Sequence, residues 1–215
     1  MKHYSCILFD LDGTLADTFS GILHSYEFAA EKLGLPVPTE KIVNEVIGAP
    51  LAEVFREHFN MDEERVREAI FYYRKEYAKE GILRAKAYAG MEETLRNLKE
   101  SQKCIGVTTL KNEEFAKQML KNMNLDCYMD VIIGMDGKDK LTKAMLITKA
   151  ISQLNQKKES TVLVGDSCYD AVGAKEAGID FIGVTYGFGF KTKEDIAEYE
   201  NVGAIKHPIE ILLNV

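Results

Sequence analysis

The sequence Cys6-Ile7-Leu8-Phe9-Asp10-Leu11-Asp12-Gly13-Thr14 joins a short apolar run to two aspartates and a glycine. A near-continuous apolar run of this length is typical of a strand buried on both faces of a parallel sheet. The aspartates follow directly, so they would stand at the carboxyl end of that strand, where open parallel sheets bind their ligands. This stretch therefore predicts an α/β fold and the location of a functional site.

Four more apolar runs predict further strands, at 105–109, 131–133, 161–164 and 181–184. Amphipathic patterns predict helices around them, at 91–98, 115–123, 144–154 and 170–177. Strands that alternate with helices form βαβ units, whose right-handed crossovers place helices on both faces of a parallel sheet. We therefore expect a Rossmann-like parallel sheet as the core of an α/β protein.

A long helical segment separates the first and second strands. Apolar residues recur at helical spacing from Phe19 to Leu33, and Gly34 and Pro36 end that pattern. Pro38-Thr39 opens a second helix, and a third is marked by apolar residues between 66 and 77. A helical segment of this length is too long to be a single crossover between the first two strands. We therefore expect an inserted helical cap domain at 17–87, with a catalytic core formed by 1–16 and 88–215.

Composition limits the class of protein. The chain has 215 residues, of which 46% are hydrophobic and 28% charged, as in ordinary globular proteins. A net charge of −7 disfavours a nucleic-acid partner, and no apolar run approaches the ~18 residues of a membrane-spanning helix. Four scattered cysteines without a CxxC pair indicate a reducing compartment. We expect a cytoplasmic protein without a membrane partner, and either a monomer or a homodimer.

Carboxylates, hydroxyls and lysines follow the predicted strands. The residues concerned are Asp10, Asp12, Thr109, Lys140, Lys143, Asp166 and Asp170. Clustered carboxylates repel one another unless a cation neutralises them, and oxygen ligands beside a phosphate favour Mg²⁺. Asp10 is the candidate nucleophile and Asp12 the candidate acid and base, while Gly13 allows a tight turn in which residues 11–14 wrap an anion.

These residues resemble the motifs of a known superfamily. Asp10-Leu11-Asp12-Gly13-Thr14-Leu15-Ala16-Asp17 looks like the first motif of the haloacid dehalogenase superfamily, and Gly165-Asp166-Ser167-Cys168-Tyr169-Asp170 resembles its fourth, GDxxxD. Thr109 stands where the second motif has Ser or Thr, and Lys143 or Lys140 where the third has lysine. The resemblance covers essentially the whole chain, including the cap, and is closest to the phosphoglycolate phosphatase-like branch.

The resemblance implies roles for individual residues. Asp10, Asp12, Asp166 and Asp170 would hold Mg²⁺ or support its ligands, and Thr109 with the backbone of Leu110 would bind the phosphoryl group. Gly13, Thr14 and the cap residue Gly48 would contact substrate. The chain departs from the family at Leu110, where Asn or Ser is common, and it lacks the KPxP sequence around the third-motif lysine. We expect Lys143 to fill that position, because it begins a predicted helix.

The expected function is a Mg²⁺-dependent phosphatase that hydrolyses a small cytosolic, phosphoglycolate-like phosphomonoester through an aspartyl phosphate. A β-phosphoglucomutase-like phosphomutase, a pyrophosphatase and a nucleotidase share the same motifs and remain alternatives. A dehalogenase needs neither an acid at position 12 nor a metal, so Asp12 and Asp170 count against that alternative. A phosphoacceptor signalling domain would also gather acids and a lysine, but it needs an open face rather than a cap that excludes water.

Overall fold

The computed structural model describes residues 3–136 and 140–215. The chain forms two compact units: a core unit of Met1–Asp17 and Ala87–Val215, and a helical unit of Thr18–Lys86. Each boundary differs by one residue from the expected domains at 1–16, 17–87 and 88–215. Residues 137–139, in the loop expected to precede the third-motif lysine, lie outside the described part.

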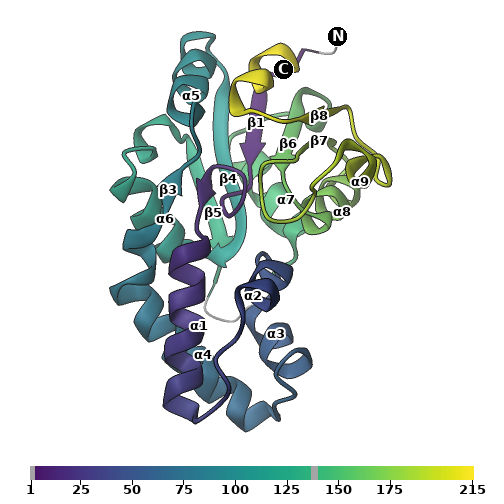
Figure 1. The fold of residues 1–215 in the computed structure, drawn as a ribbon. Helices are drawn as coiled ribbons and strands as arrows, with labels where there is room; N and C mark the ends of the chain where they lie inside the picture. Colours follow the sequence, from purple (N-terminus) through teal and green to yellow (C-terminus); the bar gives the residue numbers. More distant parts are fainter. Residues whose placement is uncertain (1–2, 137–139) are drawn as a thin grey trace. The chain divides into compact units, whose positions relative to one another are not determined.

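The core unit is built on a six-stranded parallel sheet (Figure 1). Its strand order is β5-β4-β1-β6-β7-β8, so the chain runs outward from β1 on one side and then returns to continue on the other. The position at which the order reverses is a switch point, where the strand ends open into a crevice. The bounds are β1 Cys6–Phe9, β4 Cys104–Asn112, β5 Val131–Met135, β6 Thr161–Gly165, β7 Asp180–Val184 and β8 Gly203–Ile205.

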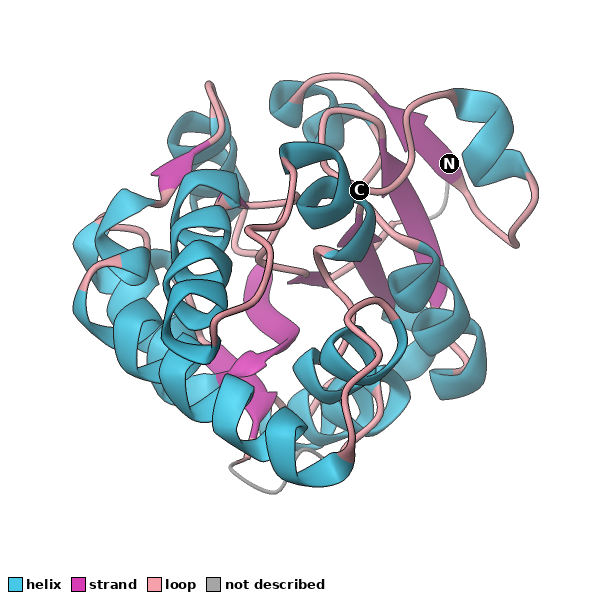
Figure 2. Ribbon diagram, turned by 60° about the horizontal axis from the view of Figure 1, so that its bottom comes forward, coloured by secondary structure: helices cyan, strands magenta, loops and turns pink. Residues whose placement is uncertain are grey.

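Helices flank the strands of the core unit (Figure 2). Helices α7 (Lys143–Gln153) and α8 (Cys168–Ala177) pack together on one face of the sheet, and right-handed crossovers place α5 (Met91–Glu100) and α6 (Glu113–Asn122) on the other. The described part of the chain also contains the short helix α9 (Lys193–Ala197) and the two-stranded pair β2 (Ala16–Asp17) and β3 (Lys86–Ala87). Four 3₁₀ turns are described as well, and the first of them belongs to the helical unit. These turns are η1 (Gly81–Arg84), η2 (Asp126–Tyr128), η3 (Lys158–Ser160) and η4 (Pro208–Leu213).

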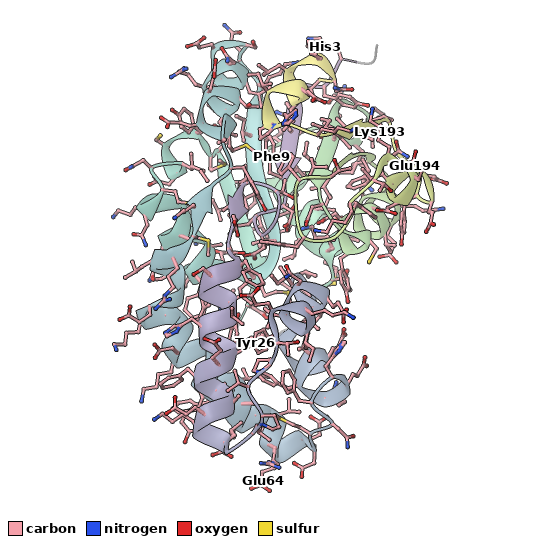
Figure 3. All side chains as sticks on the ribbon, viewed as in Figure 1. His3, Phe9, Tyr26, Glu64, Lys193 and Glu194 are labelled. Atoms are coloured by element: carbon pink, nitrogen blue, oxygen red, sulfur yellow. The ribbon has the colours of Figure 1, made fainter. Side chains whose placement is uncertain are left out.

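Side chains of β1 and β4 alternate between the two faces of the sheet. Cys6 and Leu8 belong to the apolar cluster beneath α7 and α8. Phe9 (labelled in Figure 3) follows Leu8 along β1, so its side chain faces the opposite side of the sheet. In β4, a Cβ added at Gly106 would lie 2.8 Å from the side chain of Leu8. Leu110 packs against the same cluster. Even-numbered residues of both strands therefore face α7 and α8.

The helical unit contains α1 (Phe19–Leu33), α2 (Glu40–Val46), α3 (Leu51–Glu57) and α4 (Glu63–Lys79). Tyr26 of α1 (Figure 3) packs against the rings of Phe55 and Tyr73, at centroid distances of 5.4 and 4.8 Å. Gly34 ends α1 with a φ of 62°, and Asp62 caps α4 by accepting the backbone N–H groups of residues 64 and 65. Three helices lie where the sequence predicts them, and α3 is an addition.

Most elements shift by a few residues from the expected bounds, and three of the differences have a clear structural reason. Strand β4 extends beyond the predicted 105–109, because its last residues pair irregularly with β5. Helix α8 starts at Cys168 rather than 170, because Ser167 and Asp170 form its capping box. Strand β8 was not predicted, since three residues give too short a pattern. Among the described residues, none of the helices is long and apolar enough to cross a membrane.

Candidate active site

Four charged side chains, each from a different element, meet at the carboxyl ends of the central strands. Asp10 follows β1, Asp166 follows β6, Asp170 lies in the first turn of α8, and Lys143 is the first residue of α7. All four are buried, with exposed fractions of 7, 3, 1 and 5% respectively. One carboxylate oxygen from each of the three aspartates lies within 4.8 Å of the others. The structure thus gathers predicted residues that are 160 positions apart in sequence.

Lys143 bridges two of these carboxylates. Its Nζ lies 2.5 Å from Asp10 Oδ1 and 2.6 Å from Asp170 Oδ1. Burial alone would lower the pKa of Lys143, but the two carboxylates raise it above its ordinary value. Gly173 leaves room for the stem, since a Cβ there would lie 2.5 Å from Lys143 Cγ. Lys140, the alternative third-motif residue, is exposed.

Burial and crowding change the acidity of the aspartates. Loss of water raises the pKa of Asp10 well above its usual range, and Lys143 only partly offsets that effect. Burial and the charge of Asp170 likewise raise the pKa of Asp166, to about 7. Three acids face one lysine, so the cluster holds more negative charge than its own cation neutralises.

A glycine-rich loop after β7 fixes Asp166. The backbone N–H groups of Phe188 and Gly189 donate to Asp166 Oδ2 at 2.6 and 3.0 Å. A Cβ at Gly187 would lie 2.2 Å from the carbonyl oxygen of Gly13, so this close approach requires glycine. The stretch Tyr186–Gly189 therefore borders the site and orients a carboxylate.

Asp170 has two structural tasks. Its Oδ2 accepts the backbone N–H and the hydroxyl of Ser167, at 3.1 and 2.7 Å, and so caps α8. Its Oδ1 pairs with Lys143. Because both oxygens are engaged, Asp170 orients the lysine and the helix start, and Asp10 and Asp166 are better placed to meet a ligand.

The loop after β1 carries two buried polar atoms without a hydrogen-bond partner among the described residues. Gly13 has a φ of 83°, in the left-handed region that favours glycine, and a Cβ there would lie 2.2 Å from Asp166 Oδ2. Among the described residues, buried Asp12 Oδ1 and Thr14 Oγ1 have no hydrogen-bond partner. Buried polar atoms normally find hydrogen-bond partners, so Thr14 Oγ1 indicates a ligand site, whereas Asp12 Oδ1 lies 3.1 Å from the ammonium of Lys111.

Thr108, which was not a predicted site residue, shares the face of Asp10. Phe9 pairs with Val107 in the β1–β4 register, so the following residues, Asp10 and Thr108, stand side by side. The Oγ1 of Thr108 is buried and has no hydrogen-bond partner among the described residues. The predicted Thr109 is one residue further along, and its Oγ1 accepts the backbone N–H of Lys111 at 3.1 Å.

Lys111 is a second charged residue that the predicted site did not include. Its Nζ lies 3.1 Å from Asp12 Oδ1, and both side chains are only about one-tenth exposed. This contact is an ion pair between two nearly buried side chains. The predicted Leu110 packs its side chain into the core cluster, and Gly48, with a φ of 91°, belongs to the helical unit. Their contacts with a substrate stay predictions.

The acid cluster fits a divalent cation. Its donors are carboxylate oxygens, which hard ions such as Mg²⁺ prefer, and three of them converge in a buried space. A cation would neutralise the charge that Lys143 leaves uncompensated, and that charge is what raises the pKa values of Asp10 and Asp166 together with burial. Asp10 and Asp166 are the side chains that would hold it.

Comparison with known proteins gives a consistent family. A model of the haloacid dehalogenase-like hydrolases matches residues 7–184. The chain is 34% identical to a 5′-nucleotidase of Pseudomonas aeruginosa over 87% of this chain and 85% of that protein. It is 35% identical to the pyrophosphatase PpaX of Halalkalibacterium halodurans, over 84% of this chain and 83% of that one.

Solved structures agree in fold. A protein described as a predicted phosphatase from Clostridium acetobutylicum superposes with a TM-score of 0.92 at 35% identity, covering 99% of this chain and 100% of that one. Names of other relatives vary: a phosphoglycolate phosphatase of Neisseria meningitidis is 29% identical over 89% of this chain and 85% of its own. A tyrosine-protein kinase of Mycobacterium tuberculosis is 30% identical over 95% of this chain and 69% of its own.

Proposed function

We propose that this chain, which belongs to the haloacid dehalogenase-like hydrolase family, is a phosphatase that hydrolyses small phosphomonoesters through an aspartyl phosphate on Asp10. The observation that carries the proposal is the buried cluster in which Lys143 bridges Asp10 and Asp170 beside Asp166. A carboxylate fixed by an ammonium can accept a phosphoryl group, which divides one difficult hydrolysis into two easier steps.

The first step transfers the phosphoryl group. A carboxylate oxygen of Asp10 attacks phosphorus, the bond from phosphorus to the leaving oxygen breaks, and Asp12 gives its proton to that oxygen. Lys143 stabilises the charge on the transferring group, as positioned cations do in phosphoryl transfer. A hydroxyl from Thr108 or Thr109 and the turn of Gly13 and Thr14 would hold its remaining oxygens.

The second step releases phosphate. Asp12, now a carboxylate, removes a proton from a water molecule, and that water attacks the phosphorus of the aspartyl phosphate. Cleavage of the acyl phosphate restores the Asp10 carboxylate and gives inorganic phosphate.

Mg²⁺ is the cofactor we assign to the acid cluster, with Asp10 and Asp166 as side-chain ligands. Asp12 would contribute through its backbone, and Asp170 would support the site through Lys143. When bound, Mg²⁺ would offset the negative charge of the incoming phosphate and polarise its oxygens. The oxygen-only donor set supports this choice.

The substrate we propose is a small phosphorylated metabolite in the cytoplasm, with phosphoglycolate-like esters as the first candidates. Relatives named 5′-nucleotidase and pyrophosphatase keep nucleotides and pyrophosphate as alternatives, and a phosphomutase shares the same chemistry. The buried acid at position 12 disfavours a dehalogenase, which requires no proton donor there.

A turnover assay tests the proposal. With p-nitrophenyl phosphate and Mg²⁺, the wild type should release many phosphates per chain, and excess chelator should abolish that release until Mg²⁺ is restored. Asp10→Asn is the matched control, because an amide is almost the same size but cannot accept the phosphoryl group. Release of one phosphate equivalent or none, or full activity in Asp10→Asn, would overturn the assignment. A panel of phosphoglycolate, nucleoside monophosphates and pyrophosphate then identifies the substrate class.

A further inference from the structure

Strand β4 contains an irregularity beside the site. Thr108 pairs with Ile133 of β5, but the next pairing joins Asn112 to Met135. The chain therefore advances by four residues in β4 and by two in β5, which leaves two extra residues between Thr108 and Asn112. Such bulges change the direction of a side chain, and they are common next to active sites.

The bulge is held in place by specific contacts. The backbone N–H of Lys111 donates to Thr109 Oγ1 at 3.1 Å, and Gly134 of β5 lies so close that a Cβ there would be 2.7 Å from the carbonyl oxygen of Lys111. Gly134 N–H in turn donates to Glu113 Oε2 at 3.2 Å. The backbone at Lys111 is thus fixed from both sides, so its long side chain starts from a defined point.

That side chain reaches Asp12. Lys111 Nζ lies 3.1 Å from Asp12 Oδ1, and the two side chains are 9 and 10% exposed. Without hydrogen bonds from described residues, Asp12 Oδ1 is oriented at the site by this charge. The attraction in an ion pair with so little access to water is screened less than at the surface, and loss of one partner leaves a buried charge uncompensated.

We propose that Lys111 is a positioning residue for Asp12: it holds the carboxyl group where the proton passes to the leaving oxygen. This inference rests on the proposed phosphatase function and assigns a task to a residue outside the motifs. After proton transfer, Asp12 is a carboxylate beside an ammonium, so the same contact keeps it in place for the water step.

The test compares two leaving groups of similar shape. p-Nitrophenolate leaves without much help from an acid, whereas unsubstituted phenolate is more basic and depends on protonation. We compare kcat/KM for p-nitrophenyl phosphate and phenyl phosphate, because kcat/KM reports the phosphoryl-transfer step. In Lys111→Met the preference for the nitrophenyl ester should rise by about tenfold or more, on the scale of a misplaced general acid. Lys111→Arg, which keeps the charge, should show a smaller increase in this preference than Lys111→Met.

Lys175→Met serves as the control, since Lys175 forms an exposed ion pair with Glu200 (3.0 Å) far along the chain and should leave both rates unchanged. Equal losses for the two esters in Lys111→Met, or no loss, would overturn the inference. If Lys111→Met folds poorly, the same substitution is compared in an Asp12→Asn background. There Lys111→Met should change the preference for the nitrophenyl ester by less than about threefold, because the acid that Lys111 positions is already gone. A wild type inactive on both esters would instead refute the phosphatase proposal.

Discussion

Lys143 carries the clearest prediction for a single residue. An ammonium that touches Asp10 and Asp170 in a buried site stabilises charge on the transferring phosphoryl group, whereas Lys140 is exposed. Lys143→Ala should therefore lower kcat by roughly 10²–10³-fold, as loss of an oxyanion donor does. Lys140→Ala should leave kcat nearly unchanged, because exposed charges contribute little.

Steady-state assays of the two variants at saturating Mg²⁺ and substrate check this difference. Circular dichroism of Lys143→Ala shows whether its buried carboxylates still permit folding. An inactive Lys140→Ala beside an active Lys143→Ala would show that the third motif has been placed three residues too late.

The two neighbouring threonines give a second prediction. Thr108 shares the face of Asp10 and has a buried hydroxyl without a described partner, while Thr109 Oγ1 already accepts a backbone N–H. Thr108→Val keeps the shape of the side chain and should reduce kcat/KM by about 10²-fold. Thr109→Val should cost at least tenfold less, and the reverse order of the two variants would favour Thr109 as the phosphoryl ligand.

Some residues of the candidate site can be predicted from the sequence, and others cannot. Asp10, Asp166 and Lys143 are predictable, because each directly follows a strand or begins a helix with a clear pattern. Thr108 and Lys111 are not, because their directions depend on the register of β4 and on its bulge. The sequence pattern alone does not show that β4 contains two extra residues relative to β5.

At the scale of elements, Asp130 ties β4 to the start of β5. Its Oδ2 accepts the N–H of Ile105 at 2.8 Å, and both of its oxygens lie 2.8 Å from Lys99 Nζ. Burial alone would raise the pKa of Asp130, but Lys99 and the Ile105 N–H lower it below its ordinary value. Its stabilising contribution is therefore present above the pKa of the unfolded chain, near 4, and is lost as the pH falls through the folded pKa.

Asp130→Asn should lower the free energy of unfolding of the core unit by about 1 kcal/mol at pH 7. The difference from wild type should shrink toward zero as the pH falls through the lowered pKa of folded Asp130, since both side chains are neutral below it. Urea titrations at several pH values measure it, and amide exchange at Ile105 reports the local contact. Glu200→Gln, in an exposed pair with Lys175, is the control. A difference that stays constant with pH would show that the charge of Asp130 has no part in it.

The same scale shows why most elements were predictable and some were not. Strands β1, β5, β6 and β7 are continuous apolar runs, so their positions follow from composition alone. Strand β8 pairs with β7 through Gly203–Ile205, and so short a strand exists only because a neighbour supplies its hydrogen bonds. The start of α8 depends on a capping box of Ser167 and Asp170, which lies within the GDxxxD motif. The predicted helix begins at 170 because these residues are interpreted as part of the motif and not as a helix cap.

At the scale of the whole molecule, the division into a sheet-based unit and an inserted helical unit follows from one observation, the long helical segment between the first two strands. Family membership is equally visible in the first and fourth motifs. Substrate choice is not, because relatives with different names match this chain at similar identity while the residues of the helical unit follow no motif.

The central claim is that Asp10 carries the phosphoryl group, and trapping that intermediate tests it most directly. Asp12→Asn should still be phosphorylated by p-nitrophenyl phosphate, whose leaving group needs little protonation, but should lose the base that activates water. After acid quenching, peptide mass spectrometry should find one phosphoryl group on the peptide that contains Asp10, and none in the Asp10→Asn, Asp12→Asn double variant. A phosphoryl group on another residue, or turnover by wild type with no phosphorylated peptide in Asp12→Asn, would contradict the account.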